Sequence, residues 1–416
     1  MKVKWKSNKN LKPQILMDKL AAITTFGDNG QPRYAAFEKL ELDSVMLTML
    51  DFDRAYSDST IKRIYAAAMN QCALDRRFDT KSLLEFLGVA VAKHEAKRET
   101  PYVMVTSVSL AEGFALSKIT TKKAVIRSWP KGLPKKYSTR STHEWKLKAD
   151  PLPPEYCAVT VTLKSKDPMD AFIAAMNELD YVRGLHCLVL NPESEFRFGT
   201  GSSAPLNKVM LGGMHTLHDQ RGKLINKQIY WYERNYEVRS VLTVKNRLML
   251  KKNFEFFDAN MAAFKDGPAV KDAFVRYVRA FDEQDRNVTI QKAWASLESL
   301  LSPGENNADA IVRRASFLFS ERSYYKQVLE HLREYRNRNV HLGYEVENLD
   351  YHCYQLQMFF KQAIFFYLRN AEFFEDLASA NKFLDMPSDV SELQKLRRTV
   401  DKAILFQTPV AGDEAR

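Results

Sequence analysis

Hydrophobic and polar positions alternate differently in the two parts of the chain. Up to about residue 255, segments rich in β-branched and aromatic residues are interleaved with segments of helical spacing. Strands are expected at residues 102–108, 124–129, 156–163, 209–211 and 228–232. Helices are expected at residues 60–69 and 81–96, and from Asp167-Pro168 to about residue 180. This part of the chain is therefore predicted to mix α and β structure.

From about residue 260 onward, the apolar positions recur with helical spacing throughout. Helices are expected at residues 269–281, 289–301, 307–319, 321–340, 345–378 and 388–402. Short loops between amphipathic helices predict an antiparallel bundle. The expected fold class is α+β, with a mixed N-terminal domain (1–255), a helical bundle (256–406) and a disordered tail (407–416).

Charge is distributed unevenly between these parts. The formal net charge is +11, but residues 282–416 hold 17 Lys and Arg against 21 Asp and Glu, whereas residues 1–281 hold 45 against 30. A concentrated positive charge predicts a surface that attracts nucleic acid. A solvated surface that keeps the protein in solution is the alternative interpretation.

The densest basic segment covers residues 122–148, where a single acid, Glu144, stands among the cations and Trp129, Tyr137 and Trp145 are interleaved with them. Cations neutralise phosphates, and aromatic rings stack on unpaired bases. The Pro and Gly content predicts a long loop, which would equally suit a surface linker. The residues predicted to bind nucleic acid are Lys122, Lys123, Arg127, Lys131, Lys135, Lys136 and Arg140.

The residues with the clearest chemistry lie near the C-terminus. The run is Arg336-Asn337-Arg338-Asn339-Val340-His341, followed by Gly343. Arginine suits a phosphate, and histidine transfers protons near neutral pH. RNA cleavage needs little more, because the 2′-hydroxyl is the nucleophile, so no metal or other cofactor is expected. Five residues span about 1.4 helical turns, so Arg336 and His341 would converge only if the helix ended near Val340, where Gly343 suits a terminator.

A simpler interpretation of the same run is structural. Cationic side chains at the end of a helix interact favourably with the helix dipole, and His341 would then be a C-terminal capping residue. The spacing of these residues does not separate the two interpretations.

The C-terminal part of the chain resembles a HEPN domain of the Apea-like kind. The resemblance rests on two segments, Ala293-Trp294-Ala295-Ser296-Leu297-Glu298-Ser299-Leu300-Leu301 and Arg336-Asn337-Arg338-Asn339-Val340-His341-Leu342-Gly343. It implies a metal-independent endoribonuclease of a toxin or antiviral system, working as a dimer with the motif at the subunit interface. Some members of this superfamily bind without cleaving.

The resemblance also implies roles for individual residues. His341 would be the general acid or base, Arg336 would bind the scissile phosphate, and Asn337 would hold the histidine or the phosphate. Arg338 would steer RNA or simply face solvent. Glu298 would orient Arg336 or form a structural ion pair, and the neighbouring Trp294 is expected in the core.

Other features of the sequence argue against a secreted, membrane-spanning or metal-binding protein. Cys72, Cys157, Cys187 and Cys353 form no CxxC pair, which fits a reducing cytoplasm, and the N-terminus has no apolar run typical of a signal peptide. Charges interrupt the aromatic stretch 358–374, which predicts a core helix rather than a membrane span. The run 215–219, with His215 and His218, predicts a surface hairpin more than a metal site. The glycine-rich run 199–203 is expected to be an ordinary loop and not a phosphate-binding loop. His186 and Cys187 stand among apolar residues and are expected in the core.

The sequence thus predicts a cytoplasmic homodimeric nuclease that pairs through its helical bundle. The expected partner is RNA, with transfer RNA as one candidate, and activation by a phage or cellular trigger is expected. No membrane is expected to be involved. The alternative is a non-catalytic module that binds a nucleotide or nucleic acid, or that only dimerises.

Overall fold

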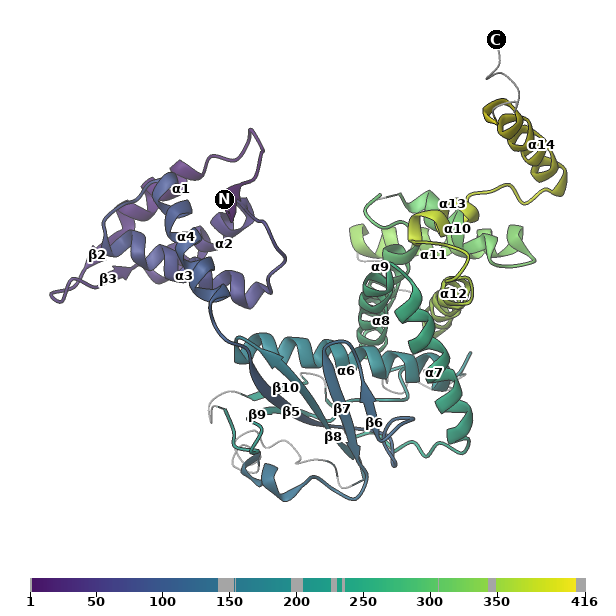
Figure 1. Cartoon of the computed structure of the whole chain (residues 1–416), viewed down its shortest axis with the longest axis horizontal. Helices are drawn as coiled ribbons and strands as arrows, with labels where there is room; N and C mark the ends of the chain where they lie inside the picture. The colour runs from purple at the N-terminus through teal and green to yellow at the C-terminus, as the bar shows by residue number, and fades with distance from the viewer. Residues whose placement is uncertain are drawn as a thin grey trace, which may run out of the picture.

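The computed structural model describes residues 2–140, 153, 155–195, 205–225, 230–233, 236–305, 307–342 and 349–408, without the side chains of residues 36, 230 and 339–342. Helices make up 57% and strands 14% of the structure, which confirms a mixed α and β class. Figure 1 shows an N-terminal helical domain, a central sheet and a group of C-terminal helices.

The N-terminal domain is built from four helices and two short antiparallel strand pairs. The helices are α1 (Pro13–Ile23), α2 (Ala36–Met49), α3 (Asp58–Leu74) and α4 (Thr80–Glu95). The strand pairs are β1 (Val3–Trp5) with β4 (Leu50–Phe52), and β2 (Thr24–Phe26) with β3 (Pro32–Tyr34). A hydrophobic core of its own holds the domain together and includes Met17, Leu20, Ile64 and Leu87.

The central sheet has six antiparallel strands in the order β10-β9-β5-β8-β7-β6. They are β5 (Thr100–Val108), β6 (Lys118–Thr120), β7 (Ala124–Trp129), β8 (Cys157–Ser165), β9 (Met214–His218) and β10 (Tyr230–Tyr232). This confirms the strands expected at 102–108, 124–129 and 156–163. The expected strand at 209–211 is instead an isolated bridge between Leu211 and Val108.

Two sequence predictions about this region are only partly right. Residues 215–218 lie in a hairpin, because His218 bridges Leu224 across a turn, but the side chains of β9 are all buried and not at the surface. The described part of the basic segment contains a 3₁₀ helix (Lys135–Arg140) after the expected strand β7, so it is not loop throughout. Its residues 141–148 lie outside the described residues. In both cases pairing with distant strands decides the structure, and local composition does not report such pairing.

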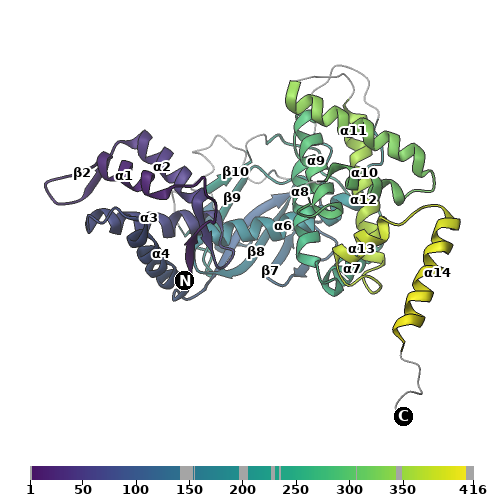
Figure 2. The same ribbon diagram turned by 90° about the horizontal axis from the view of Figure 1, so that it is seen from above.

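Helix α6 (Pro168–Leu190) packs on the sheet and joins it to the C-terminal helices (Figures 1 and 2). It begins where Asp167-Pro168 predicted, because the Asp167 side chain caps the helix, but it continues ten residues beyond the expected end. Gly184 allows α6 to approach α8 closely, since a Cβ at this position would lie 3.2 Å from the Phe274 carbonyl oxygen.

The C-terminal helices follow the predicted pattern with two exceptions, of which the first is that the helix at residues 247–263 was not predicted. They are α7 (Arg247–Ala263), α8 (Gly267–Phe281), α9 (Arg286–Leu301), α10 (Ala308–Phe317), α11 (Arg322–Leu342), α12 (Asp350–Arg369), α13 (Leu377–Leu384) and α14 (Val390–Gln407). The single helix expected at 345–378 is wrong in extent, because α12 ends at Arg369 and Asp376 caps the separate helix α13. The core position of the aromatic stretch is confirmed, because half of the residues of α12 are buried.

One hydrophobic core is shared by the sheet, α6 and the C-terminal helices. It includes Val161 of β8, Leu179 of α6, Phe274 of α8, Trp294 of α9 and Phe360 of α12. The boundary expected after residue 255 falls inside α7, and the cores divide the chain between α4 and β5 instead.

Helix α14 projects away from the rest of the molecule (Figures 1 and 2) and has no buried residue. It extends to Gln407, and residues 409–416 of the expected tail lie outside the described residues. Among the described helices, none is both long enough and apolar enough to cross a membrane.

Candidate functional site

The Arg-Asn-x-x-x-His run occupies the C-terminal end of α11, which continues through residue 342. The helix is therefore continuous from Arg336 to His341 and ends two residues beyond Val340, whereas convergence of the two side chains would require a break between them. On a continuous helix, positions 336 and 341 point about 140° apart. Gly343 and the His341 side chain lie outside the described part of the structure.

Arg336 and Asn337 are in contact with each other. The Nη1 atom of Arg336 donates a hydrogen bond to Oδ1 of Asn337 at 3.1 Å, and both side chains are half-buried. Position 336 follows Leu329 and Leu332 along the core-facing side of α11, and position 337 is one helical turn before position 341. Asn337 thus restrains the guanidinium of Arg336 from the row of helix positions that leads to 341.

Tyr335 fixes this end of α11 to the bundle. The ring is buried, and its hydroxyl donates a hydrogen bond to Oδ1 of Asn287, in the first turn of α9, at 2.6 Å. The contact places the motif at a defined position on an anchored helix end.

The two supporting residues named from the sequence are not positioned alike. Arg338 is exposed, and its Nε atom lies 3.7 Å from the Glu334 carboxylate. Glu298 is half-buried on α9, eleven residues and therefore about 16 Å beyond Asn287 along the helix axis. The described contacts contain no ion pair between Glu298 and Arg336, and Trp294 is a core residue as expected.

A pair of histidines beside the motif was not predicted from the sequence. The Nε2 atoms of His331 on α11 and His352 on α12 are 3.3 Å apart, and the His352 ring lies 5.3 Å from that of Tyr335. Burial, and then the neighbouring His331, lower the pKa of His352. The two histidines are 21 positions apart in the sequence, which is no recognisable ligand spacing, so only the packing of α11 near α12 reveals the pair.

The basic residues predicted to bind nucleic acid divide into two groups. Those with exposed side chains are Lys122, Lys123, Arg127, Lys131, Lys135 and Lys136. Arg140 is buried, and its guanidinium donates hydrogen bonds to the carbonyl oxygens of Val105 and Met214 and to the Thr216 hydroxyl. The predicted role of Arg140 in binding nucleic acid is therefore wrong, because this cation holds the 3₁₀ helix against the sheet.

The aromatic residues of the segment also serve the fold. Tyr137 is buried, and the indole N–H of the half-buried Trp129 donates to the Thr160 hydroxyl at 3.0 Å. Tyr137 is thus not available for stacking on bases. Trp145 lies outside the described residues.

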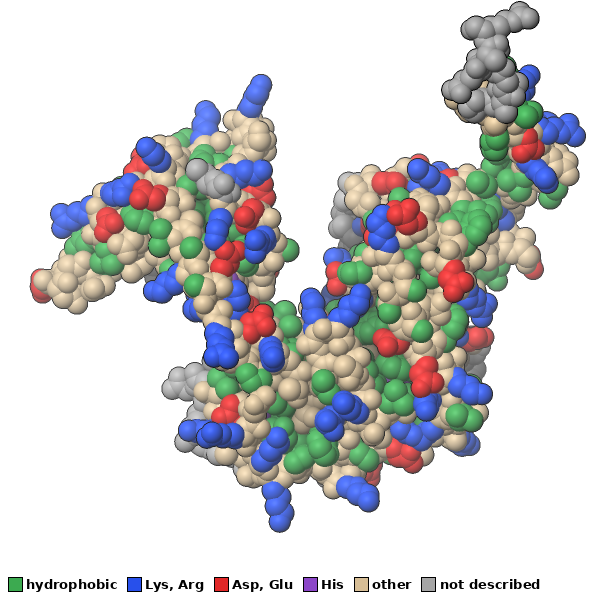
Figure 3. All heavy atoms as spheres, viewed as in Figure 1, with side chains coloured by type: hydrophobic (Ala, Val, Ile, Leu, Met, Phe, Trp, Pro, Cys, Tyr) green, Lys and Arg blue, Asp and Glu red, His purple; other side chains and the backbone are tan. Residues whose placement is uncertain are grey.

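Lys122 and Lys123 line a large groove between the N-terminal domain and the C-terminal helices. Its volume is about 880 Å³, and Figure 3 shows it as a hollow with Lys and Arg side chains at its floor. Lys164 and Lys166 add positive charge from the sheet, while Tyr56 forms part of the opposite wall. The groove also has acidic residues on its C-terminal side, at Glu178, Asp258 and Asp272.

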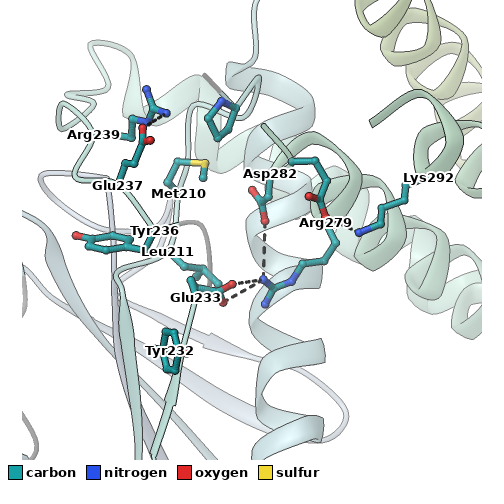
Figure 4. Close-up of a pocket in the computed structure, with 12 residues that line it drawn as sticks. Met210, Leu211, Tyr232, Glu233, Tyr236, Glu237, Arg239, Arg279, Asp282 and Lys292 are labelled. Atoms are coloured by element: carbon teal, nitrogen blue, oxygen red, sulfur yellow. Dashed lines mark hydrogen bonds and ion pairs between the residues drawn. The ribbon is translucent and has the colours of Figure 1, made fainter. Parts of the chain in front are cut away.

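A smaller pocket of about 310 Å³ lies between the sheet and α8 (Figure 4). Both terminal nitrogens of Arg183 contact Asp282, at 2.6 and 2.7 Å, and Arg279 contacts both carboxylate oxygens of Glu233 at 3.0 Å. Burial acts to raise the pKa of Glu233, but the His215 hydrogen bond and the Arg279 charge hold it well below its usual range. The network therefore joins the end of β10 to α6 and α8 through paired charges.

His215 and His218 take part in the sheet's internal hydrogen bonds. Nδ1 of His215 lies 2.7 Å from the Thr106 hydroxyl and Nε2 lies 3.0 Å from Glu233, while Nδ1 of His218 lies 2.9 Å from the Gly222 carbonyl oxygen. His186 is likewise buried, as expected. Within the described ranges, no three side chains of His, Cys, Asp or Glu are placed to share a metal ion.

Comparison with known proteins finds no matching family model, no similar curated protein and no similar solved structure. The site is therefore interpreted from its own residues.

Proposed function

We propose that this protein is a metal-independent endoribonuclease whose site is formed at the C-terminal end of α11. The observation that carries the proposal is the hydrogen bond between Arg336 and Asn337 on a helix end that Tyr335 anchors to α9. This arrangement holds a bidentate phosphate-binding group beside the face that carries His341.

The chemistry requires few groups. Arg336 would bind the scissile phosphate and stabilise the charge that develops on it, and His341 would transfer the proton of the 2′-hydroxyl or of the leaving oxygen. Asn337 would keep the Arg336 guanidinium oriented. Arg338, exposed and weakly paired with Glu334, would attract RNA without contacting the reacting atoms.

The geometry of a continuous helix favours a site completed by two chains. Because positions 336 and 341 point about 140° apart, one chain would not direct both groups at the same phosphate. In a homodimer paired through the bundle, Arg336 of one chain would face His341 of the other. A monomer would then be inactive.

The basic part of the chain would bring RNA, or an activating ligand, to this enzyme. Residues 1–281 carry the excess of positive charge, and Lys122 and Lys123 line the groove beside the N-terminal domain. Such a two-part design suits a toxin or antiviral nuclease of the cytoplasm that responds to a phage or cellular trigger. Transfer RNA is one candidate substrate.

A second function, a non-catalytic module for nucleotide binding or dimerisation, is favoured by the position of Glu298. One of the two roles expected for this residue is to orient Arg336, yet it lies about 16 Å along α9 from the anchor of α11. A helical bundle that has the motif but lacks a contact between Glu298 and Arg336 would bind RNA without cleaving it.

The deciding experiment is cleavage of total RNA and defined transfer RNAs in excess EDTA, by the parent protein and by the His341→Ala variant. The expected result is cleavage by the parent alone, leaving 2′,3′-cyclic phosphate ends. Equal cleavage by both proteins would exclude His341 from the reaction. Binding of RNA by both without cleavage, in the presence of cell extract that supplies a trigger, would establish the non-catalytic function.

A further inference from the structure

His331 and His352 face each other from two different helices. Their Nε2 atoms are 3.3 Å apart, and the ring planes are inclined by 77°. His331 is exposed and His352 is half-buried. The pair therefore lies at the surface, where an ion could reach the gap between the two nitrogens.

The separation of the two nitrogens is that of a long hydrogen bond and also that of two ligands of one metal ion. Hydrogen bonds from N–H donors are commonly about 2.7–3.2 Å long, so the observed distance is beyond the upper end of this range. In a tetrahedral zinc site the metal–nitrogen distance is about 2.0–2.1 Å, which places two imidazole nitrogens about 3.3 Å apart. The rings thus have the spacing of two zinc ligands.

The surroundings of His352 would hold its ring in the orientation that a ligand needs. Its Nδ1 atom and Oε1 of Gln355, three residues further along α12, are both buried, and neither has a hydrogen-bond partner in the described part of the chain. A proton on Nδ1 directed at Gln355 leaves the Nε2 lone pair facing His331, as in metal-bound histidines supported by a second group. The Tyr335 ring packs edge-on beside it.

We propose that His331 and His352 together bind a divalent transition-metal ion of the zinc type, with water completing its coordination. Imidazole is a preferred ligand of zinc, cobalt and nickel, whereas magnesium and calcium take oxygen ligands. The proposal does not depend on the nuclease activity, because neither histidine belongs to the motif.

Binding of the ion would connect α11 to α12 five residues before Arg336. The ion would then link the two helices in addition to the polypeptide chain that connects them. An ion that binds the folded state alone stabilises that state.

The test uses the untagged full-length protein, first freed of metal with EDTA and then titrated with Zn²⁺ or Co²⁺. We expect one ion per chain by calorimetry and a visible Co²⁺ absorption typical of a tetrahedral ion. We also expect a rise in Tm of about 2 °C or more at saturating Zn²⁺. Mg²⁺ at the same concentration should give none of these. Absence of Zn²⁺ and Co²⁺ binding by the parent would overturn the proposal.

Variants assign the binding to the pair. His331→Ala, at an exposed position that the fold does not need, and His352→Gln should each lose the Co²⁺ absorption and the Zn²⁺-dependent rise in Tm. His341→Ala should keep both, and His331→Ala should keep RNA cleavage in EDTA, so that failure of the metal site and failure of the nuclease are distinguishable. Unchanged metal binding by His331→Ala would show that the ion lies elsewhere and would overturn the proposal.

Discussion

The hydroxyl of Tyr335 donates a 2.6 Å hydrogen bond to the Asn287 side chain and so joins the last turns of α11 to the first turn of α9. Asn287 lies in the first turn of α9, where fewer backbone hydrogen bonds restrain the chain, and Tyr335 lies two turns before the end of α11. The position of the adjacent Arg336 relative to the bundle depends on this contact more than on α11 alone.

Replacing this hydroxyl should therefore affect both stability and the motif. We expect Tyr335→Phe to lower the free energy of unfolding by about 1 kcal/mol, because the Asn287 amide oxygen loses a buried partner. Urea denaturation measures the change, and Tyr324→Phe, at an exposed tyrosine on the same helix, is the matched control. RNA cleavage by Tyr335→Phe should also fall, whereas an unchanged rate would show that the motif does not depend on the anchor.

Arg336 and Arg338 should respond differently to the same substitution. Arg336→Lys keeps a positive charge but removes the bidentate fork and the contact with Asn337, so we expect cleavage to slow by about 100-fold. Arg338→Lys, at an exposed position, should change the rate less than about threefold. Single-turnover rates on a defined RNA measure both. Equal losses would mean that the two cations act only by attracting RNA.

The basic residues should separate into structural and RNA-binding positions. We expect Arg140→Met to lower the free energy of unfolding by about 3 kcal/mol, because two backbone carbonyl groups and the Thr216 hydroxyl lose their buried donor. Thermal denaturation measures this loss.

The double variant Lys122→Ala/Lys123→Ala should leave Tm unchanged and weaken RNA binding. Both side chains are exposed in the groove, so their removal should reduce the slope of log affinity against log salt by about 1–2. Lys326→Ala, an exposed lysine of α11, serves as the control for loss of charge elsewhere. An unchanged salt dependence would remove the groove from the RNA path.

Acid should destabilise the protein through His186. Burial lowers the pKa of this histidine to about 4, since its ring is enclosed, Nδ1 lies 2.7 Å from the Val182 carbonyl oxygen, and Nε2 accepts a hydrogen bond from the Ala115 N–H. Only the neutral ring fits both partners. Between about pH 6.5 and 4 the unfolded state binds the proton and the folded state does not, so this stabilisation is complete above pH 6.5 and is lost as the pH falls.

The size of this effect should reach about 3 kcal/mol at pH 4. Urea denaturation of the parent and of His186→Gln between pH 4 and 8 measures it. The variant should be less stable at pH 8 but should lose less stability on acidification. Parallel curves for the two proteins would show that other groups cause the acid sensitivity.

The helices and strands that were predicted well are those in which the spacing of apolar residues within the element itself indicates the buried face. Helices α8 and α9 and strand β7 have the expected extents to within a few residues, because each carries an apolar face or an alternating pattern of its own. The expected helix at 345–378 failed because a run of aromatic residues continues past Arg369 while the chain turns at Asn370.

Features that depend on distant pairing were not predictable in the same way. The run containing His215 and His218 follows two glycines and resembles a turn, but β9 becomes a buried strand through its pairing with β5. Arg140 looked like part of a basic surface because no local pattern reveals its acceptors, which belong to β5 and β9. The site residues at 336–341 were located by motif, whereas their anchor at Asn287 and the neighbouring His352 come from the packing of the bundle.

The core shared by the sheet and the C-terminal helices determines which portion of this protein can be exchanged as a unit. Phe274 packs against α6 at Gly184, and helices α6 and α8 are joined by buried ion pairs as well as apolar contacts. A fragment beginning at α7 would leave this surface exposed to water and would aggregate rather than fold. The junction after α4 is therefore the place where the chain can be cut by limited proteolysis or joined to another protein. The N-terminal domain can be exchanged as a unit, whereas the sheet must stay with the helices that carry the motif.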